Sequence, residues 1–524
     1  MLMPKAKTAM ALIEEMALRY PEREALIGGD ARYSWIEFRT AVRGLAKGLH
    51  AAGIQRGDKV AILMGNRPEW LIADFAIMAL GGVMVAVNTW STARELAYQL
   101  SHSETRLLIM SDRFLKRDYA ALMQEALATE YDLASLGRIY CLTDGAVPKG
   151  MYPLESLQQL GENITDIEID AMQDTVTGDD IACLLYTSGS TALPKGVLLQ
   201  HFALIENMWA IGERLHLRTD DRLWLAVSLF WGLGCENALF AIWSHGAAIV
   251  LQEHFDAGEA LRLIEAERCT VFYGTPNMTL ALTEHPDLVS RDISSLRVGA
   301  TLGSPEQIRC LVDLGVPEAC QIYGLTETYG NCSINDAHDT LVHRSETIGK
   351  PLPGNDMIIV DDETDARLPP GEIGEIRLKG YVTPGYYKDP EKTAEAFDEN
   401  GYFRTGDLGF YDADGYFYFR GRTKEMIKTG GINVSPAEIE EVLLSHDAVE
   451  LAYVIGLKDT RRDEIVVAVI VARSAVEEQE LRTLCLDALA AYKVPRQIKF
   501  TSHGELPLTS TGKLQKNRLK ELFG

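Results

Sequence analysis

The stretch best suited to chemistry is a loop of hydroxyl and glycine residues that ends in a lysine. It reads Thr187-Ser188-Gly189-Ser190-Thr191-Ala192-Leu193-Pro194-Lys195. Backbone N–H groups of small residues can converge on an anion, the hydroxyls can donate further hydrogen bonds, and the lysine supplies charge. Apolar runs at 181–186 and 197–199 predict a strand–loop–strand hairpin, so this is not a Walker loop. The loop is suited to a polyphosphate, and a flexible turn is the alternative for it alone.

A second stretch, Tyr323-Gly324-Leu325-Thr326-Glu327-Thr328, follows Gln321-Ile322 at the end of a predicted strand. The ends of parallel strands are where α/β folds place their ligands. Thr326 could contact a phosphoryl oxygen there, and Glu327 could hold Mg2+ beside a polyphosphate. An ordinary capped turn is the alternative.

Three further stretches carry single charged groups near glycines. Asp407 follows Gly406 and could accept both hydroxyls of a ribose, or form an Asx-type turn. Arg422 offers a planar donor fork ahead of Gly430-Gly431, or belongs to a basic interdomain linker. Lys513, in a Gly- and Thr-rich turn, taken alone is typical of a solvated loop charge.

The composition restricts the class of protein. At 524 residues the chain is long enough for two or more domains, and its formal charge of −24 argues against binding nucleic acid or an anionic membrane. Its eight scattered cysteines include no Cys-x-x-Cys pair, which favours reduced thiols in a cytoplasmic protein. The most apolar stretch, 71–87, contains Asp74 and Gly81-Gly82, which predicts a buried helix, a turn and a strand rather than a membrane span.

Strands and helices alternate along the first two thirds of the chain. The alternation runs to about residue 142, and after a polar stretch at 143–180 and the loop it resumes to beyond residue 304. This pattern predicts two α/β units with parallel sheets. Short alternating segments from about residue 348 predict a small β region, and the last hundred residues predict a compact α+β unit.

These five stretches, in this order over nearly the whole chain, closely resemble the motifs of the adenylate-forming enzymes. That superfamily comprises acyl-CoA synthetases, peptide-synthetase adenylation domains and firefly luciferase, and the chain is most similar to the acyl-CoA synthetases. Two more stretches carry the resemblance, Gly349-Lys350-Pro351-Leu352-Pro353-Gly354 and Gly371-Glu372-Ile373-Gly374-Glu375-Ile376.

The resemblance implies a fold and a set of roles. It implies an AMP-binding domain over 1–423, made of two α/β subdomains and a β-barrel-like part, and a small mobile α+β lid over 424–524. ATP would be bound by the loop from Thr187 to Lys195 at its β- and γ-phosphates, by Thr326 at its α-phosphate, and by Glu327 through Mg2+. The remaining implied positions are Gly299, Ala300, Gln321, Ile322, Tyr323 and Gly324 at adenine, Asp407 and Arg422 at ribose, Lys424 at the hinge, Gly430 and Gly431 at the pantetheine tunnel, and Lys513 in adenylation.

The same resemblance predicts an acyl pocket and exposes two departures. Ala192 stands where the family usually has glycine, which costs on the order of 1 kcal/mol if that position needs positive φ. Trp231 stands where many acyl-CoA synthetases have histidine, and we interpret it as a pocket wall or gate rather than plain core. Glu236 and Asn331 would suit an acid with a polar group, although Glu236 could instead cap the next helix. The predicted pocket residues are Phe230, Trp231, Gly232, Cys235, Glu236, Thr275, Gly330 and Asn331.

The sequence therefore predicts an ATP-dependent carboxylic acid–CoA ligase that acts through an acyl-adenylate and releases AMP and pyrophosphate. The candidate catalytic residues are Lys513, Thr326, Glu327 and Lys195, and the cofactors are ATP, Mg2+ and coenzyme A. One alternative is an adenylating enzyme that transfers its acyl group to a carrier protein or another acceptor. Another is a non-catalytic protein on the same fold. A homodimer is compatible with the sequence, and the acid is left open between a cyclic or aromatic acid and a medium-chain fatty acid.

Overall fold

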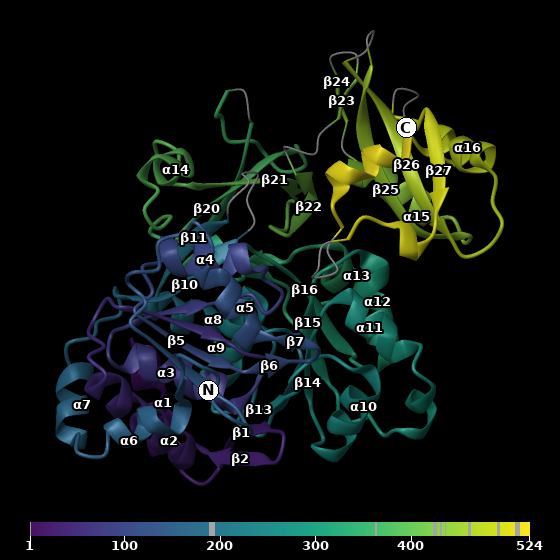
Figure 1. Ribbon diagram of the computed structural model, residues 1–524. Helices are drawn as coiled ribbons and strands as arrows, with labels where there is room; N and C mark the ends of the chain where they lie inside the picture. Colours follow the sequence, from purple (N-terminus) through teal and green to yellow (C-terminus); the bar gives the residue numbers. More distant parts are fainter. Residues whose placement is uncertain are drawn as a thin grey trace. The chain divides into compact units, whose positions relative to one another are not determined.

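The computed structural model forms two compact units (Figure 1). The first unit comprises Met1–Asp356 and Leu378–Phe403, and the second comprises Met357–Arg377 and Arg404–Gly524. The described residues are 2–187, 194–361, 364–422, 427–429, 432–434, 436–459, 463–489, 493–508 and 514–523.

A seven-stranded sheet carries the predicted hairpin. Its strands in spatial order are β11 (Lys195–Gln200), β10 (Ile181–Thr187), β4 (Val83–Ala86), β3 (Lys59–Leu63), β5 (Leu107–Ser111), β8 (Arg138–Leu142) and β9 (Tyr152–Pro153). β10 and β11 pair antiparallel, which confirms the strand–loop–strand prediction, and β10 lies parallel to β4 with Cys183 opposite Met84. The hairpin thus joins the sheet of the first 142 residues, so the polar stretch at 143–180 is not a boundary between sheets.

A nine-stranded sheet holds the other predicted strand ends. Its spatial order is β18 (Lys350–Pro351), β17 (Ser333–Ile334), β16 (Glu318–Tyr323), β15 (Val298–Thr301), β14 (Val271–Tyr273), β12 (Arg222–Leu225), β13 (Ala248–Leu251), β1 (Glu24–Gly28) and β2 (Ala31–Ser34). The strands from β16 through β1 are parallel. β1 comes from the N-terminal end of the chain and pairs with β13, with Ile27 opposite Val250.

Helices connect these strands and fill the core. The helices are α1 (Ala9–Arg19), α2 (Trp35–Ala51), α3 (Pro68–Ala79), α4 (Ala93–His102), α5 (Tyr119–Leu127), α6 (Leu154–Leu160), α7 (Asp166–Gln173), α8 (His201–Arg214), α9 (Leu239–Ser244), α10 (Ala257–Ala266), α11 (Pro276–Thr283), α12 (Pro305–Leu314), α13 (Leu341–Glu346) and α14 (Pro390–Glu395). A π-helical turn spans Leu233–Ala238, and 3-10 turns span Pro286–Ser290 and Thr326–Thr328. The strands β6 (Arg113–Phe114) and β7 (Arg117–Asp118) form a separate two-stranded sheet.

One hydrophobic core contains residues of both large sheets and of the helices between them. Ile62 of β3 and Leu225 of β12 are fully buried in it, together with Phe75 of α3. The rings of Phe75 and Trp243 of α9 lie 5.1 Å apart, so α3 and α9 pack against each other through aromatic contacts. The two sheets are therefore held by a shared apolar interior, and their strand ends have fixed positions relative to each other.

The apolar stretch at 71–87 has the structure that its sequence predicted. α3 begins at Pro68, Gly81 takes a positive φ of 68° in the turn, and β4 follows. Within the described part of the chain, we find no helix that combines the length and the apolar character needed to cross a membrane.

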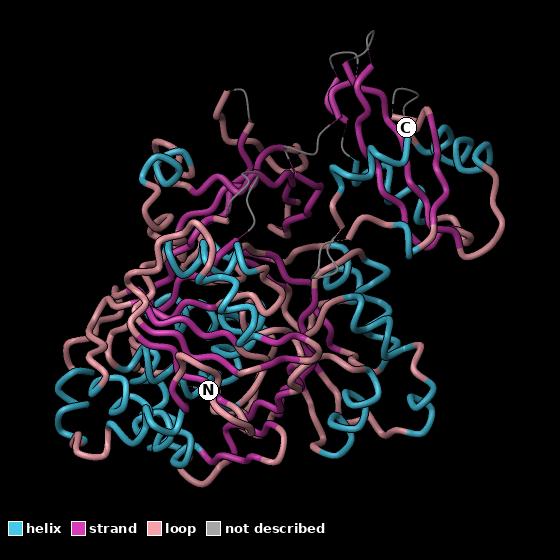
Figure 2. Tube along the Cα trace, in the orientation of Figure 1, coloured by secondary structure: helices cyan, strands magenta, loops and turns pink. Residues whose placement is uncertain are grey.

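The second unit contains a four-stranded and a five-stranded sheet (Figure 2). The first is ordered β19 (Asp356–Val360), β20 (Gly374–Lys379), β21 (Phe403–Tyr411) and β22 (Phe417–Arg422), and the second β24 (Ile432–Val434), β23 (Ile427–Thr429), β26 (Asp463–Ala472) and β25 (Val449–Asp459), with β27 (Gln497–Thr501) parallel to β26. The helices are α15 (Pro436–Leu444), α16 (Glu478–Ala488) and 3-10 turns at His503–Glu505 and Lys516–Phe523.

A large α/β part followed by a smaller α+β part confirms the predicted fold class. The predicted domain boundary at 423/424 falls among residues 423–426, which are outside the described residues, so it stays a prediction.

Candidate active site

Lys195 is fixed at the base of the β10–β11 hairpin, directly opposite Thr187. The carbonyl oxygen of Pro194 accepts a hydrogen bond from the Tyr98 hydroxyl at 3.0 Å, and that of Gly196 accepts one from the N–H of Tyr387 at 2.8 Å. The residues flanking Lys195 are thereby tied to two other segments of the first unit. The loop residues predicted to contact phosphate, Ser188, Gly189, Ser190 and Thr191, and the departure at Ala192, lie outside the described residues.

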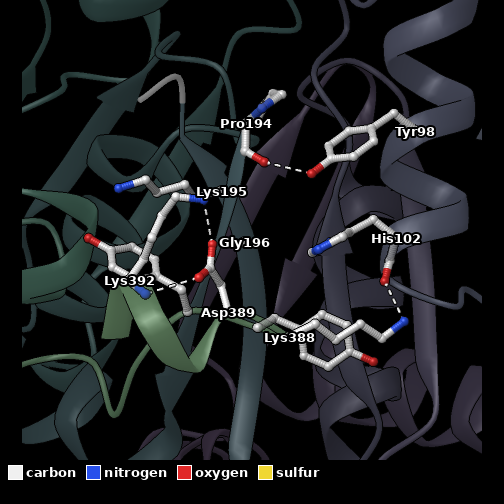
Figure 3. Close-up of a pocket in the computed structure, with 10 residues that line it drawn as sticks. Tyr98, His102, Pro194, Lys195, Gly196, Lys388, Asp389 and Lys392 are labelled. Atoms are coloured by element: carbon white, nitrogen blue, oxygen red, sulfur yellow. Dashed lines mark hydrogen bonds and ion pairs between the residues drawn. The ribbon is translucent and has the colours of Figure 1, made fainter. Parts of the chain in front are cut away.

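A pocket of about 320 Å³ lies beside this hairpin base (Figure 3). The three lysines in its lining differ in their partners. Lys388 bonds the carbonyl of His102 and pairs with Glu104, both at 3.0 Å, and Lys392 pairs with Asp389. Lys195 has no ion pair among the described residues, and its ammonium lies 4.7 Å from the ring centroid of Tyr386. Its charge is therefore available to an anion. The lining residues are Tyr98, His102, Pro194, Lys195, Gly196, Tyr386, Tyr387, Lys388, Asp389 and Lys392.

Tyr386 links Lys195 to Glu327. Its hydroxyl donates a hydrogen bond to Oε1 of Glu327 at 2.9 Å, while its ring faces the Lys195 ammonium. Burial and the nearby Glu327 charge raise the pKa of Tyr386, so the phenol remains a donor at neutral pH. The structure thus brings two predicted catalytic residues to one place through a third residue that no sequence pattern indicated.

The turn that carries Thr326 and Glu327 follows β16 directly. The hydroxyl of Thr328 accepts the N–H of Leu325 at 2.8 Å, and the carbonyl of Glu327 accepts the N–H of Thr383 at 2.7 Å. These bonds fix the turn from both sides. The capped-turn interpretation of this motif is therefore correct as a description of its backbone, and it leaves the side chains of Thr326 and Glu327 for a ligand role.

The positions predicted at adenine lie on two adjacent parallel strands. Gly299 and Ala300 are in β15, paired with Ala319 and Cys320 of β16, and Gln321 lies opposite Thr301. Their carboxyl ends lie at the same sheet edge, which is where ligands bind in such folds. Ile322 and Tyr323 complete β16, and Gly324 follows in close backbone contact, because a Cβ there would lie 2.5 Å from the Cα of Asn331.

The predicted acyl pocket is built on a π-helical turn. Phe230 and Trp231 pack edge to face with centroids 5.3 Å apart, and the carbonyl of Trp231 accepts the N–H of Cys235 at 3.0 Å inside the turn. Trp231 is half-buried rather than enclosed in the core. Thr275 lies at the start of α11, just beyond the end of β14.

Glu236 lies in this turn and is fully buried. Neither carboxyl oxygen has a hydrogen-bond partner among the described residues, so the alternative that Glu236 caps the following helix is wrong. A Cβ at Gly232 would lie 2.6 Å from its Oε2, and one at Gly330 would lie 3.3 Å from the same atom. Burial, with a smaller contribution from Glu327, raises the pKa of Glu236 well above its ordinary value.

Asn237 is a second buried polar residue of this turn, and no sequence pattern indicated it. Both polar atoms of its amide lack a partner among the described residues, as does Nδ2 of Asn331. The run from Gly234 to Asn237 has no helical pattern of apolar residues, so its sequence does not show which of its side chains are buried. Tyr386 was missed for another reason: it lies 59 residues from Glu327 in the sequence.

In the second unit, Asp407 and Arg422 contact each other. They lie opposite one another on β21 and β22, and Nε of Arg422 lies 3.0 Å from Oδ1 of the buried Asp407. Gly406 takes a positive φ of 69° just before Asp407. The two predicted ribose contacts therefore form one charged pair, and their role at ribose stays a prediction. Lys424, Gly430, Gly431 and Lys513 lie outside the described residues.

The donor set at Glu327 is compatible with Mg2+ that takes most of its ligands from phosphate and water. The group of three potential metal ligands among the described residues, His216, Asp336 and His338, does not include Glu327. Mg2+ commonly uses one or two carboxylates together with substrate phosphates. A single carboxylate, oriented by a phenol, fits that pattern.

Comparisons with known proteins agree with this geometry. A profile of AMP-binding enzymes matches residues 13–387, and one of the AMP-binding enzyme C-terminal domain matches residues 438–513. A Bacillus subtilis (strain 168) protein named as an acyl-CoA synthetase, YngI, is 36% identical over 97% of this chain and 96% of its own length. The mitochondrial medium-chain acyl-CoA ligase ACSF2 of Danio rerio is 32% identical over 99% of this chain and 88% of its own length. The crystal structure of the anthranilate CoA ligase AuaEII in complex with anthranoyl-AMP is 28% identical, covers 99% of this chain and 97% of that chain, and has a TM-score of 0.84.

Proposed function

The chain belongs to the AMP-binding enzyme family and is an ATP-dependent, AMP-forming carboxylic acid–CoA ligase that acts through an acyl-adenylate, and on that premise we propose which of its residues do the work. The observation that carries the assignment is the position of Tyr386. Its hydroxyl donates to the Glu327 carboxylate, and its ring faces the ammonium of Lys195, which has no ion pair among the described residues. A carboxylate and a cation held side by side suit a polyphosphate and its metal ion.

Activation of a carboxylate requires such a site. Expulsion of oxide from a carboxylate is prohibitive, so the acid first attacks the α-phosphorus of ATP, which releases pyrophosphate and leaves a mixed anhydride. Both reactants are anions, and stabilisation of the charge that they bring together is the main task of the enzyme. Lys195 and the loop from Thr187 to Thr191 bind the β- and γ-phosphates, and Thr326 contacts the α-phosphate.

Glu327 would hold Mg2+, which supplies positive charge to the phosphates when bound. The chain's own part is to orient this carboxylate: the Tyr386 hydroxyl donates to Oε1, and the main-chain bond to Thr383 fixes the turn beneath it. Adenine lies at the carboxyl ends of β15 and β16, along Gly299, Ala300 and Gln321–Gly324. Ribose is bound by the Asp407–Arg422 pair.

The C-terminal part supplies the remaining groups. We assign Lys513 to adenylation, Lys424 to the hinge between an AMP-binding domain (1–423) and a lid (424–524), and Gly430 and Gly431 to the passage for the pantetheine of coenzyme A. Movement of the lid between the two half-reactions would exchange the lysine for the thiol, a gating role for a conformational change. The pocket around Trp231 would take the acyl group.

The cysteines bear on the compartment of the enzyme. All eight cysteines are free thiols, which suits a reducing compartment, and we assign the enzyme to the cytoplasm. A homodimer is compatible with the acidic chain, and light scattering would measure it.

The deciding experiment is pyrophosphate release from ATP and Mg2+ with a panel of fatty, cyclic and aromatic acids, each with and without coenzyme A. We expect one class of acid to release pyrophosphate, with coenzyme A increasing turnover and a thioester detected by mass spectrometry. Release that is indifferent to coenzyme A, with no thioester, would instead favour transfer to a carrier protein. If no acid causes pyrophosphate release, the enzymatic assignment is contradicted.

A further inference from the structure

Three side chains at the predicted acyl pocket have polar atoms without a hydrogen-bond partner among the described residues. Glu236 is fully buried, and neither of its carboxyl oxygens has a partner among the described residues. Buried polar atoms in folded proteins nearly always have a partner, so each exception needs an explanation. A carboxyl group with both oxygens unpartnered is a strong exception, because a carboxyl is among the most costly groups to remove from water.

Two buried asparagines beside Glu236 also have polar atoms without a partner among the described residues. Asn237 is fully buried and lacks partners for both Oδ1 and Nδ2, and the buried Asn331 lacks one for Nδ2. The backbone carbonyl of Asn331 is fixed by Nδ2 of Asn207 at 2.6 Å. Three buried side chains on two segments therefore retain unused donors or acceptors.

The local backbone positions these groups. Glu236 and Asn237 are consecutive residues of the π-helical turn Leu233–Ala238, and both are buried. π-helical turns are rare and occur frequently at functional sites. The turn departs from regular α-helix at the point where the unpartnered side chains lie.

Two glycines pack against the Glu236 carboxyl. A Cβ at Gly232 would lie 2.6 Å from Oε2 of Glu236, and a Cβ at Gly330 would lie 3.3 Å from Oε2 and 3.3 Å from the Cβ of Asn237. A side chain at Gly232 would clash with the carboxyl, and one at Gly330 would press on it, so both positions leave the carboxyl oxygens unobstructed only as glycine. The N–H of Gly330 donates to the carbonyl of Leu325 at 3.0 Å, just before the turn that carries Glu327, so these groups lie near the proposed phosphate site.

We propose that the acid activated by this enzyme carries a neutral oxygen function, a hydroxyl or an oxo group, which Glu236, Asn237 and Asn331 bind inside the acyl pocket. The inference rests on the proposed function and adds a substrate class to it. Burial raises the pKa of Glu236 and so favours the protonated carboxyl, which can donate to an oxo group and accept from a hydroxyl. The two amides offer both kinds of group. The acid's own carboxylate remains free to reach the α-phosphorus.

The binding physics makes the preference large. A site built to hydrogen-bond a substrate group rejects the analogue that lacks it, because its own buried polar atoms are then left unpaired. A hydrocarbon acid of the same shape gains only the apolar contacts with Trp231 and its neighbours.

The test compares matched acids in the complete enzyme. Each straight-chain, cyclic and aromatic acid is assayed beside its hydroxy and oxo counterpart, and kcat/KM is measured for pyrophosphate release. We expect the best oxygenated acid to exceed its deoxy partner by about 100-fold or more. Glu236→Met, which keeps the length of the side chain and removes its hydrogen bonds, should reduce that ratio to within about threefold, and Glu236→Gln should retain most of it.

Asp74→Leu is the matched control. Asp74 on α3 is also buried, its Oδ1 also lacks a partner among the described residues, and it is not among the pocket residues. Its near-isosteric replacement should leave the ratio unchanged. A second measurement does not depend on turnover. The wild type and Glu236→Met are titrated by calorimetry with the non-reactive acyl-sulfamoyl adenosine of each acid in the best pair. The ratio of the two affinities should match the ratio of the two kcat/KM values in each protein.

The possible outcomes distinguish failure of the substrate inference from failure of the ligase assignment. If a plain hydrocarbon acid is the best substrate, or if Glu236→Met leaves the ratio unchanged while thioester still forms, the substrate inference is wrong and the ligase function stands. If no acid supports pyrophosphate release, the assigned activity fails and the inference falls with it.

Discussion

Replacement of Tyr386 by phenylalanine removes one hydrogen bond from the proposed phosphate site and leaves the ring in place. The lost bond is the one from the hydroxyl to Oε1 of Glu327 at 2.9 Å, and the retained contact is the 4.7 Å approach of the Lys195 ammonium to the ring centroid. A hydrogen bond to a charged group contributes about 1.5–3 kcal/mol. If the bond holds Glu327 in the orientation that adenylation requires, this value sets the loss in kcat/KM at about 10- to 150-fold.

Tyr386→Leu removes the ring as well and should cost a further 0.5–2 kcal/mol, roughly, from the cation–π contact. The assay is acid-dependent pyrophosphate release, with thermal unfolding measured in parallel to detect loss of folded protein. Tyr381→Phe is the matched control, because the Tyr381 hydroxyl donates to Glu206 at 2.8 Å and neither residue belongs to the proposed site. The reasoning is refuted if Tyr386→Phe stays within twofold of the wild type, or if Tyr381→Phe loses as much activity.

Two further predictions concern stability. A Cβ at Gly324 would lie 2.5 Å from the Cα of Asn331, so Gly324→Ala should lower the free energy of unfolding by about 1–3 kcal/mol in urea titrations; Gly504→Ala, with nothing within 4 Å of its added Cβ, should change it little. Burial lowers the pKa of His201 from 6.5 to about 4. Between these values the unfolded chain binds a proton at this residue and the folded protein does not. The free energy of unfolding should therefore fall by about 1.4 kcal/mol per pH unit as the pH falls from 6.5 toward 4. His201→Gln should reduce that slope and the exposed His254→Gln should not; equal slopes in all three proteins would contradict the assignment.

Local sequence patterns predicted what local forces determine. The hairpin around the loop was predictable because two apolar runs flank a stretch of turn-forming residues, and α12 was predictable because Ser304 and Gln307 form a capping box ahead of an apolar pattern. The end of β16 was predictable as a ligand site because small and polar residues follow a buried strand.

Pairing between distant segments was not predictable from one sequence. β1 is a short apolar run with no signal for its partner, and it joins the nine-stranded sheet beside β13, more than 200 residues away. The hairpin joins the sheet of β4 rather than the strands that follow it in the sequence. Periodicity reports which face of a segment is buried but carries no information on the neighbour that buries it. Tyr386 was missed for the same reason.

Gly330 shows how one residue can meet two requirements that the sequence does not separate. It takes a positive φ of 79°, directly after Tyr329 at 56°, so the chain reverses there in a conformation that favours glycine. Its missing side chain also avoids crowding Glu236 and Asn237, because a Cβ there would lie 3.3 Å from Oε2 of Glu236 and 3.3 Å from the Cβ of Asn237. A residue chosen only for the turn could be asparagine, which tolerates this conformation, but its Cβ would press on the carboxyl that we assign to the substrate. Glycine satisfies both the backbone and the pocket, and only the structure reveals the second requirement.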